Sequence, residues 1–136
     1  MDYAISLEAA LKLKEVSYIF SEAYAAGELK HGPIALLQEN RLVVATITQP
    51  ALVEKMVSNL CEIKARGACV AVVCRNDLLE QLDGQMDVVI PIPATDDLLM
   101  PLLAAIPLQL FAYCMAVARG CDVDKPRNLA KSVTVE

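Results

Sequence analysis

Apolar residues in this chain gather in short continuous runs that alternate with stretches of helical spacing. Three runs are rich in β-branched residues and have the length of strands: 42–47, 69–74 and 86–90. Between the first two runs, residues 51–66 repeat apolar side chains at helical spacing and end at a glycine. Such a strand–helix–strand unit is parallel. The pattern predicts an α/β fold with an open parallel sheet flanked by helices.

The first part of the chain, residues 7–31, has an amphipathic helical pattern that ends in a loop at 27–33. Glu8, Lys12 and Glu15 fall at i, i+4 and i+7 and therefore share one stripe of the helix. This charged stripe can be solvated or can line a site, and spacing alone leaves both interpretations open. A second, mostly apolar stripe is expected to face the core and consists of Leu13, Val16 and Phe20, with Ser17 between them.

Residues 98–118 contain no charged side chain, and this stretch is as long as a membrane-spanning helix. Two prolines, at 101 and 107, interrupt this stretch, and the acidic pair Asp96 and Asp97 precedes it where a membrane span usually has a positive flank. We therefore predict a buried or interface helix of a protein with no membrane partner. The segment that follows, 121–136, has neither helical nor strand periodicity, and we interpret it as a tail of a single domain covering 1–136.

Composition narrows the classes of function. The 136 residues carry a net charge of -5 and no basic cluster, which argues against a nucleic-acid partner. The five cysteines lack C-x-x-C spacing and lie mostly in apolar runs, so we expect reduced core thiols in a cytoplasmic protein. A signal peptide, a zinc-like ligand cluster and the common nucleotide-binding and serine-hydrolase motifs are absent from the sequence. We therefore expect neither a metal nor a cofactor.

Three groups are candidates for chemistry, each with a structural alternative. Glu15, near lysines, is the type of carboxylate that can move a proton between adjacent carbons, although a solvated helical glutamate fits equally well. His31 is the single histidine and can serve as an acid or base, or be structural. Lys131 can act as a nucleophilic amine only where its surroundings lower its pKa.

Three long motifs, in the same order, resemble the C-terminal half of the glucosamine-6-phosphate synthase family, the isomerising glutamine:fructose-6-phosphate amidotransferases. They are LEAALKLKE at 7–15, EAYAAGELKHGP at 22–33 and DVDKPRNLAKSVTVE at 122–136. The resemblance spans essentially the whole chain. It implies a sugar isomerase (SIS) fold, a three-layer sandwich with a parallel sheet between helices. It also implies conversion of fructose 6-phosphate and ammonia to glucosamine 6-phosphate.

The resemblance also implies a role for each candidate. Glu15 is expected to move a proton between C1 and C2 of the open-chain sugar, with Lys12 beside the substrate oxygens and Glu8 near the substrate. His31 is expected to help open the sugar ring and to reach the site from the neighbouring subunit of a homodimer. Lys131 is expected to form an imine with the sugar carbonyl, with Ala130 lining the pocket, and the tail 121–136 is expected to close over the active site.

The chain also departs from the family pattern. The family has an N-terminal glutaminase and a first SIS lobe that grips the phosphate, and neither is present in these residues. The chain begins just after the place where the second lobe of the family has its first strand, so we expect the sheet to lack that strand. We expect the fragment alone to be inactive. The alternatives are a glutamine-independent SIS amino-sugar deaminase or isomerase, a non-catalytic sugar-phosphate-binding module, and a module for dimerisation only.

Overall fold

The computed structural model describes residues 1–82 and 84–129. Three longer helices and three strands form its frame: α1 (Asp2–Ser17), β1 (Leu42–Ile47), α2 (Val53–Lys64), β2 (Cys69–Arg75), β3 (Val88–Ile92) and α3 (Met100–Ala118). Short 3-10 helices connect them: η1 (Ala26–His31), η2 (Pro33–Leu36), η3 (Pro50–Leu52) and η4 (Asn76–Leu82). Ala130 and Lys131, two of the predicted site residues, lie outside the described residues.

The sheet contains three parallel strands in the order β1-β2-β3. Leu42 pairs with Cys69 at the start of β1, and Ala71 pairs with Val88 at the start of β3. The predicted parallel sheet is thus confirmed. The third strand starts two residues later than the apolar run predicted and continues through Pro91 instead of ending before it. Since β3 has a partner on one side only, a proline without an N–H is tolerated there.

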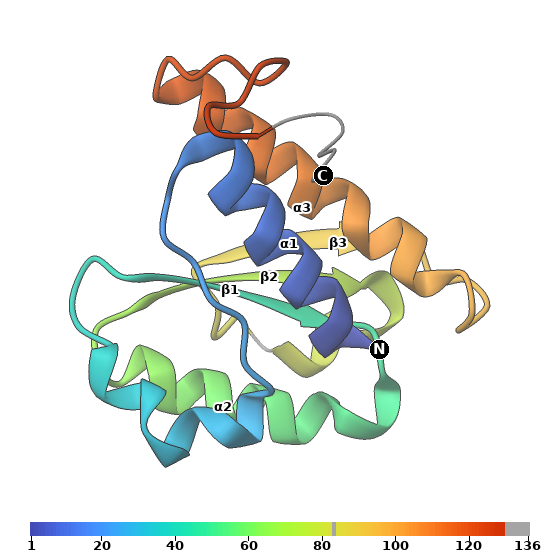
Figure 1. The fold of residues 1–136 in the computed structure, drawn as a ribbon. Coiled ribbons are helices and arrows are strands. Elements are labelled where there is room, and N and C mark those ends of the chain that lie inside the picture. Colours follow the sequence, from blue (N-terminus) through green and yellow to red (C-terminus); the bar gives the residue numbers. More distant parts are fainter. Residues whose placement is uncertain (83, 130–136) are drawn as a thin grey trace, which may run out of the picture.

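Helices cover both faces of the sheet, with α1 and α3 on one face and α2 on the other (Figure 1). Side chains of β2 alternate between these layers, as period two requires. Val70, Val72 and Cys74 lie in the core under α2 together with Leu60. Val73 joins the other core, which contains Ile5 of α1 and the buried face of α3. The three-layer α/β sandwich expected from the sequence is confirmed.

The first helix ends much earlier than its sequence pattern predicted. α1 ends at Ser17, because Tyr18 takes a left-handed conformation at φ 58° and its N–H donates to the Lys14 carbonyl. Phe20 therefore lies beyond the helix and is 80% exposed, so its predicted place in the core is wrong. Ser17 is the fully buried member of that stripe, and its hydroxyl donates to the Leu13 carbonyl at 2.6 Å.

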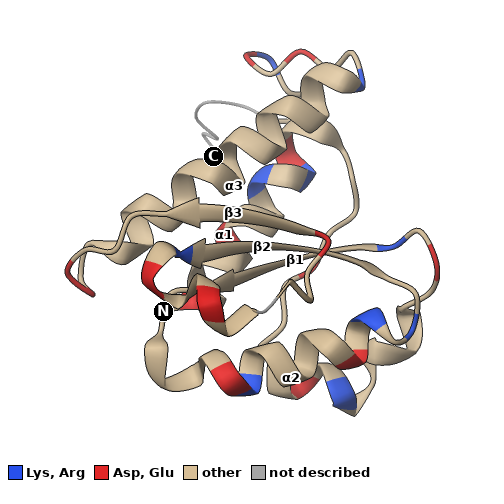
Figure 2. Cartoon of the chain, turned by 180° about the vertical axis from the view of Figure 1, so that it is seen from behind, with Lys and Arg blue, Asp and Glu red and all other residues tan. Residues whose placement is uncertain are grey.

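Helix α3 is uncharged along its whole length (Figure 2) and packs against α1 and the sheet through one face. Its buried residues recur every four positions: Met100, Ala104, Leu108, Ala112 and Ala116. By length and composition alone, α3 is also apolar enough to cross a membrane. In the structure one face of α3 packs against α1 and the sheet, and its other face is apolar and exposed.

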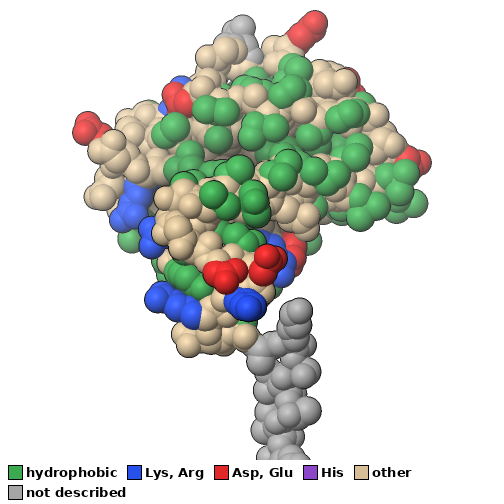
Figure 3. All heavy atoms as spheres, turned by 90° about the horizontal axis from the view of Figure 1, so that it is seen from above, with side chains coloured by type: hydrophobic (Ala, Val, Ile, Leu, Met, Phe, Trp, Pro, Cys, Tyr) green, Lys and Arg blue, Asp and Glu red, His purple; other side chains and the backbone are tan. Residues whose placement is uncertain are grey.

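That exposed face joins a neighbouring one on α1. Large apolar side chains of α3 recur at helical spacing on the outer side: Leu102, Ile106, Leu110, Tyr113 and Val117. Tyr3, Leu7 and Leu11 form a parallel exposed row on α1. Figure 3 shows hydrophobic side chains spread over this side of the molecule. We call these eight residues the apolar face.

The cysteines are less buried than their apolar surroundings in the sequence predicted. All five are free thiols. Cys74 is buried, and this burial raises the pKa of its thiol to about 11. Cys69 and Cys114 are exposed, so the expectation that they are core residues is wrong. Cys69 is the first residue of β2, and Cys114 lies on the outer side of α3. At both positions the neighbouring residues in the sequence are apolar, but the thiol itself is exposed.

Candidate functional site

The charged stripe of α1 forms as the helical spacing predicted. The Lys12 ammonium donates to Glu15 Oε2 at 2.8 Å and lies 3.7 Å from Glu8 Oε1. Glu15 is the most covered of the three, with 27% of its side chain exposed, against 37% for Lys12 and 48% for Glu8. The stripe is therefore reachable from solvent while the Glu15 carboxylate is partly sheltered.

The electrostatics of the stripe favour a charged Lys12. Its hydrogen bond to Glu15 raises the pKa of the Lys12 ammonium, and the nearby charges of Glu15 and Glu8 act in the same direction. A lysine held as a cation cannot serve as a nucleophile or base at neutral pH. It can instead stabilise negative charge on an oxygen placed near it.

His31 lies in a different layer from the charged stripe. It is the last residue of η1, is exposed, and precedes Gly32. Lys30 of the same short helix forms an ion pair of 2.6 Å with Glu62 of α2. η1 therefore lies beside α2 on one face of the sheet, whereas α1 lies on the other face (Figure 1). Within one chain the structure does not bring His31 together with Glu15.

The start of the tail lies against the end of α1. The backbone N–H of Arg127 donates to the Tyr18 hydroxyl at 2.8 Å, and the Arg127 guanidinium lies 4.1 Å from the centre of the Tyr18 ring. The Cys121 thiol points at the Ser17 carbonyl at 3.9 Å. Residues 121–129 form no helix or strand, as their sequence predicted. Glu15 and the beginning of the tail thus share the same end of α1.

A second polar cluster, which the sequence analysis missed, occupies the carboxyl end of the sheet. Thr48 follows β1, and both its N–H, at 3.0 Å, and its hydroxyl donate to the Asp2 carboxylate. Arg75, at the end of β2, donates to Asp77 at 2.7 Å and to Asp97 at 3.2 Å. The hydrogen bond from Arg75 lowers the pKa of the Asp77 carboxyl. The Asp2–Thr48 and Arg75–Asp97 pairs join segments that are distant in the sequence, so no local sequence signal predicts them.

This cluster and the charged stripe lie at opposite ends of α1. Asp2 begins the helix at the carboxyl end of β1, and the helix then runs over the sheet so that Glu15 lies near its other end (Figure 1). Ligands of open α/β sheets commonly bind at the carboxyl ends of the strands. Here that edge is closed by ion pairs around Arg75, whose side chain is 12% exposed.

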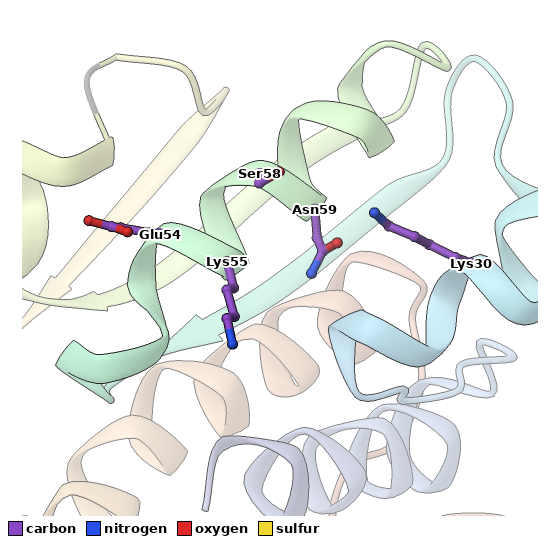
Figure 4. Close-up of a pocket in the computed structure, with 5 residues that line it drawn as sticks. All are labelled: Lys30, Glu54, Lys55, Ser58 and Asn59. Atoms are coloured by element: carbon purple, nitrogen blue, oxygen red, sulfur yellow. The ribbon is translucent and has the colours of Figure 1, made fainter.

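An open depression of about 400 Å³ lies between η1 and α2. Its lining residues are Lys30, Glu54, Lys55, Ser58 and Asn59. Figure 4 shows Lys55 and Asn59 pointing to the same side of α2, with Lys30 reaching toward Asn59 from η1. None of the predicted site residues that the structure describes lines it. Among the residues that the structure describes, no group of His, Cys, Asp or Glu is arranged to hold a metal ion.

Comparison with known proteins identifies relatives over the whole chain. The chain is 60% identical over 136 residues to a protein of Caldanaerobacter subterraneus named glutamine–fructose-6-phosphate aminotransferase (isomerizing). The match covers 100% of this chain and 22% of that relative, so the chain spans about a fifth of the length of the curated relative.

Two solved structures are also similar to this chain. The C-terminal domain of glucosamine-fructose-6-phosphate aminotransferase from Francisella tularensis superposes with a TM-score of 0.87 at 43% identity, over 91% of this chain and 35% of that one. Glucosamine-6-phosphate deaminase from Thermotoga maritima superposes with a TM-score of 0.77 at 32% identity, over 98% of this chain and 37% of that one. The SIS domain family matches residues 1–119. The chain therefore belongs to the SIS domain family.

Proposed function

We propose that this chain is the C-terminal isomerase part of a glutamine–fructose-6-phosphate aminotransferase and acts in the cytoplasm without a cofactor. The reaction converts fructose 6-phosphate and ammonia to glucosamine 6-phosphate. One observation carries the proposal: a sheltered carboxylate, Glu15, beside a charged lysine lies at the end of α1 against which the tail begins to dock. The names of the relatives at 60% and 43% identity support it.

The proposed chemistry assigns one role to each group. The Lys131 amine attacks the C2 carbonyl of the open-chain sugar, and water leaves as the imine forms. Ammonia then adds to the imine carbon and the Lys131 amine leaves, so that the C2 imine carries the nitrogen of ammonia. Glu15 takes a proton from C1 and returns it to C2, because the imine withdraws electrons from the carbon beside it. The Lys12 cation stabilises the oxygen on which negative charge develops. Glu8, one helical turn before Lys12, is assigned to substrate binding, and Ala130 is assigned to the lining of the substrate pocket.

A homodimer is part of the proposal. His31 and Glu15 lie on opposite faces of the sheet in one chain, so a histidine that opens the sugar ring at the Glu15 site must come from a partner. The apolar face on α1 and α3 offers the uncharged area that a stable subunit contact needs. A charge introduced within it, as in Ile106→Glu, is expected to yield monomers by sedimentation analysis, whereas Glu54→Lys on the opposite layer is expected to leave the mass unchanged.

The experiment measures glucosamine 6-phosphate formed from fructose 6-phosphate and ammonia. We expect Glu15→Gln to lower kcat of the complete gene product by about a hundredfold or more, because a positioned base contributes that much. Glu54→Gln on α2 is the matched control and is expected to be neutral. Residues 1–136 alone are expected to form no product and to bind the sugar phosphate poorly. Unchanged turnover in Glu15→Gln contradicts the proposed role.

Mixed dimers test whether His31 acts across the interface. Glu15→Gln and His31→Ala subunits, each inactive alone, are mixed after dissociation. If His31 acts in trans, half of the mixed dimers' sites carry neither change, so random assortment restores about a quarter of the original activity. If the histidine acts within its own chain, every site keeps one defect and no activity returns.

A second candidate is an amino-sugar deaminase, which the structural likeness to the Thermotoga maritima deaminase favours. The two functions run the same proton transfer in opposite directions, so the site residues do not separate them. Two assays of the complete gene product distinguish the functions. Release of ammonia from glucosamine 6-phosphate, with no synthesis of this sugar from glutamine, favours the deaminase. Synthesis that consumes glutamine favours the aminotransferase.

A further inference from the structure

The end of α1 holds an unusual backbone conformation. Tyr18 closes the helix in the left-handed region, at φ 58° and ψ 23°. Helices usually end this way at glycine, because a side chain in this region costs about 1 to 2 kcal/mol. A tyrosine there persists only where its surroundings hold it. The contacts of its side chain show what holds it.

Arg127 contacts two separate parts of the Tyr18 side chain. Its guanidinium lies over the ring at 4.1 Å from the centroid, and its backbone N–H donates to the hydroxyl at 2.8 Å. Asn128 then turns the chain through a left-handed residue of its own, at φ 62°. A depression of about 330 Å³ lies next to these residues, lined also by Lys14 and Phe20. Arg127 and Asn128 are therefore placed next to the end of α1.

We propose that Tyr18 and Arg127 form a positioning pair that fixes the base of the tail beside the charged stripe of α1. The inference rests on the proposed function, in which Lys131 and Glu15 act on one sugar. Glu15 precedes Tyr18 by three residues, which is about 4.5 Å along a helix. Lys131 follows Arg127 by four residues, which span at most about 14 Å. A tail held at Arg127 thus keeps the Lys131 amine within reach of a small substrate bound beside Glu15.

The alternative is that the contact only caps α1. A cap affects stability and leaves the chemistry of the folded protein unchanged. A positioning pair affects how often the Lys131 amine reaches the carbonyl, and this lowers kcat and imine formation while the substrate KM changes little. Misplacement of a reacting group by about 1 Å can cost about a hundredfold in rate. The two roles therefore differ in their kinetic signature.

The test uses the complete gene product and four variants. Tyr18→Ala removes both contacts, and Arg127→Ala removes the guanidinium over the ring but keeps the backbone donor. Tyr18→Phe keeps the ring but removes the hydroxyl acceptor, and Phe20→Ala is the matched control on the same depression. Fructose 6-phosphate is reduced onto the protein with borohydride, and the modified lysine is measured by mass spectrometry beside kcat and KM. Trypsin cleavage after Arg127 reports whether the tail base is held.

We expect Tyr18→Ala to lower kcat and trapping at Lys131 about ten- to a hundredfold with KM within about threefold. Tyr18→Phe and Arg127→Ala are expected to be intermediate, because the first keeps the cation–π contact and the second keeps the backbone hydrogen bond. Phe20→Ala is expected to match the parent. Tyr18→Ala is also expected to speed cleavage after Arg127 about tenfold. The inference is overturned if Tyr18→Ala is cleaved faster after Arg127 but is trapped at Lys131 as well as the parent. It is also overturned if the rate of cleavage after Arg127 is unchanged. Absence of trapping in the parent itself refutes the proposed function instead.

Discussion

The Asp2 carboxylate holds the first turn of α1 to the sheet, and we expect its removal to lower the stability of the fold. Its carboxylate accepts both the N–H and the hydroxyl of Thr48, which is buried at 4% exposure just after β1. Hydrogen bonds to a charged group contribute about 1.5 to 3 kcal/mol, and a buried donor left without a partner adds to the loss. We expect Asp2→Ala to lower the free energy of unfolding by about 2 kcal/mol.

The size of this effect can be checked by thermal and urea unfolding. An unfolding entropy of about 2.1 cal/mol/K per residue implies that a loss of 2 kcal/mol lowers Tm by roughly 7 °C in a chain of this length. Asp97→Ala is the matched control, because Asp97 also forms an ion pair but is 79% exposed. Its loss is expected to stay below about 1 kcal/mol.

A double-mutant cycle assigns the loss to the contact itself. Thr48→Val removes the hydroxyl while keeping the shape of the side chain, and it is combined with Asp2→Ala. If the two residues act through one contact, the double variant loses less than the sum of the single losses by about 1 kcal/mol. Additive losses, or a loss below about 0.5 kcal/mol in Asp2→Ala, would refute the reasoning that this contact anchors α1.

Three further outcomes follow from the core, a turn and an ion pair. Leu60→Ala, on the buried side of α2 where the side chain is 2% exposed, is expected to lower the free energy of unfolding by about 2 to 5 kcal/mol in urea. Gly67→Ala is expected to cost about 1 to 2 kcal/mol, because Gly67 has φ +87° and a Cβ there would lie 2.9 Å from Glu39 Cγ. Hydrogen bonds from Lys64 and a backbone N–H lower the pKa of Asp87, so its stabilising effect relative to Asp87→Asn is complete at neutral pH. Unfolding curves recorded at decreasing pH should show this advantage fading below about pH 3.8.

The strands were predictable from the sequence because their signal is local. Continuous runs of β-branched residues at 42–47 and 69–74 indicate strands buried on both faces, and the structure has strands there. The end of β3 was misplaced because a proline usually ends a strand, whereas Pro91 lies in a strand with one free edge. Whether a strand lies at an edge depends on the whole sheet, which no local pattern reports.

The end of α1 could not be predicted, for a related reason. The helical pattern continues past Ser17, and the residue type at position 18 gives no stop signal. Tyr18, which ends the helix in a left-handed conformation, contacts Arg127, which is 109 positions away in sequence. The contact between Asp2 and Thr48 joins residues 46 positions apart and was missed for the same reason. Contacts between distant segments decide these features, whereas propensity describes only neighbours.

The charged stripe and the histidine show how layers separate residues that the sequence places close together. Glu15 and His31 are sixteen positions apart, and their motifs follow one another directly. Between them, however, the chain leaves α1, passes the sheet and reaches the layer of α2, where Lys30 binds Glu62. The tail, more than a hundred positions from Glu15, begins instead beside the end of α1. The order of motifs along the chain therefore does not decide which groups meet. The layer in which each motif lies decides this, and for this reason the proposed function takes the histidine of the Glu15 site from a partner subunit.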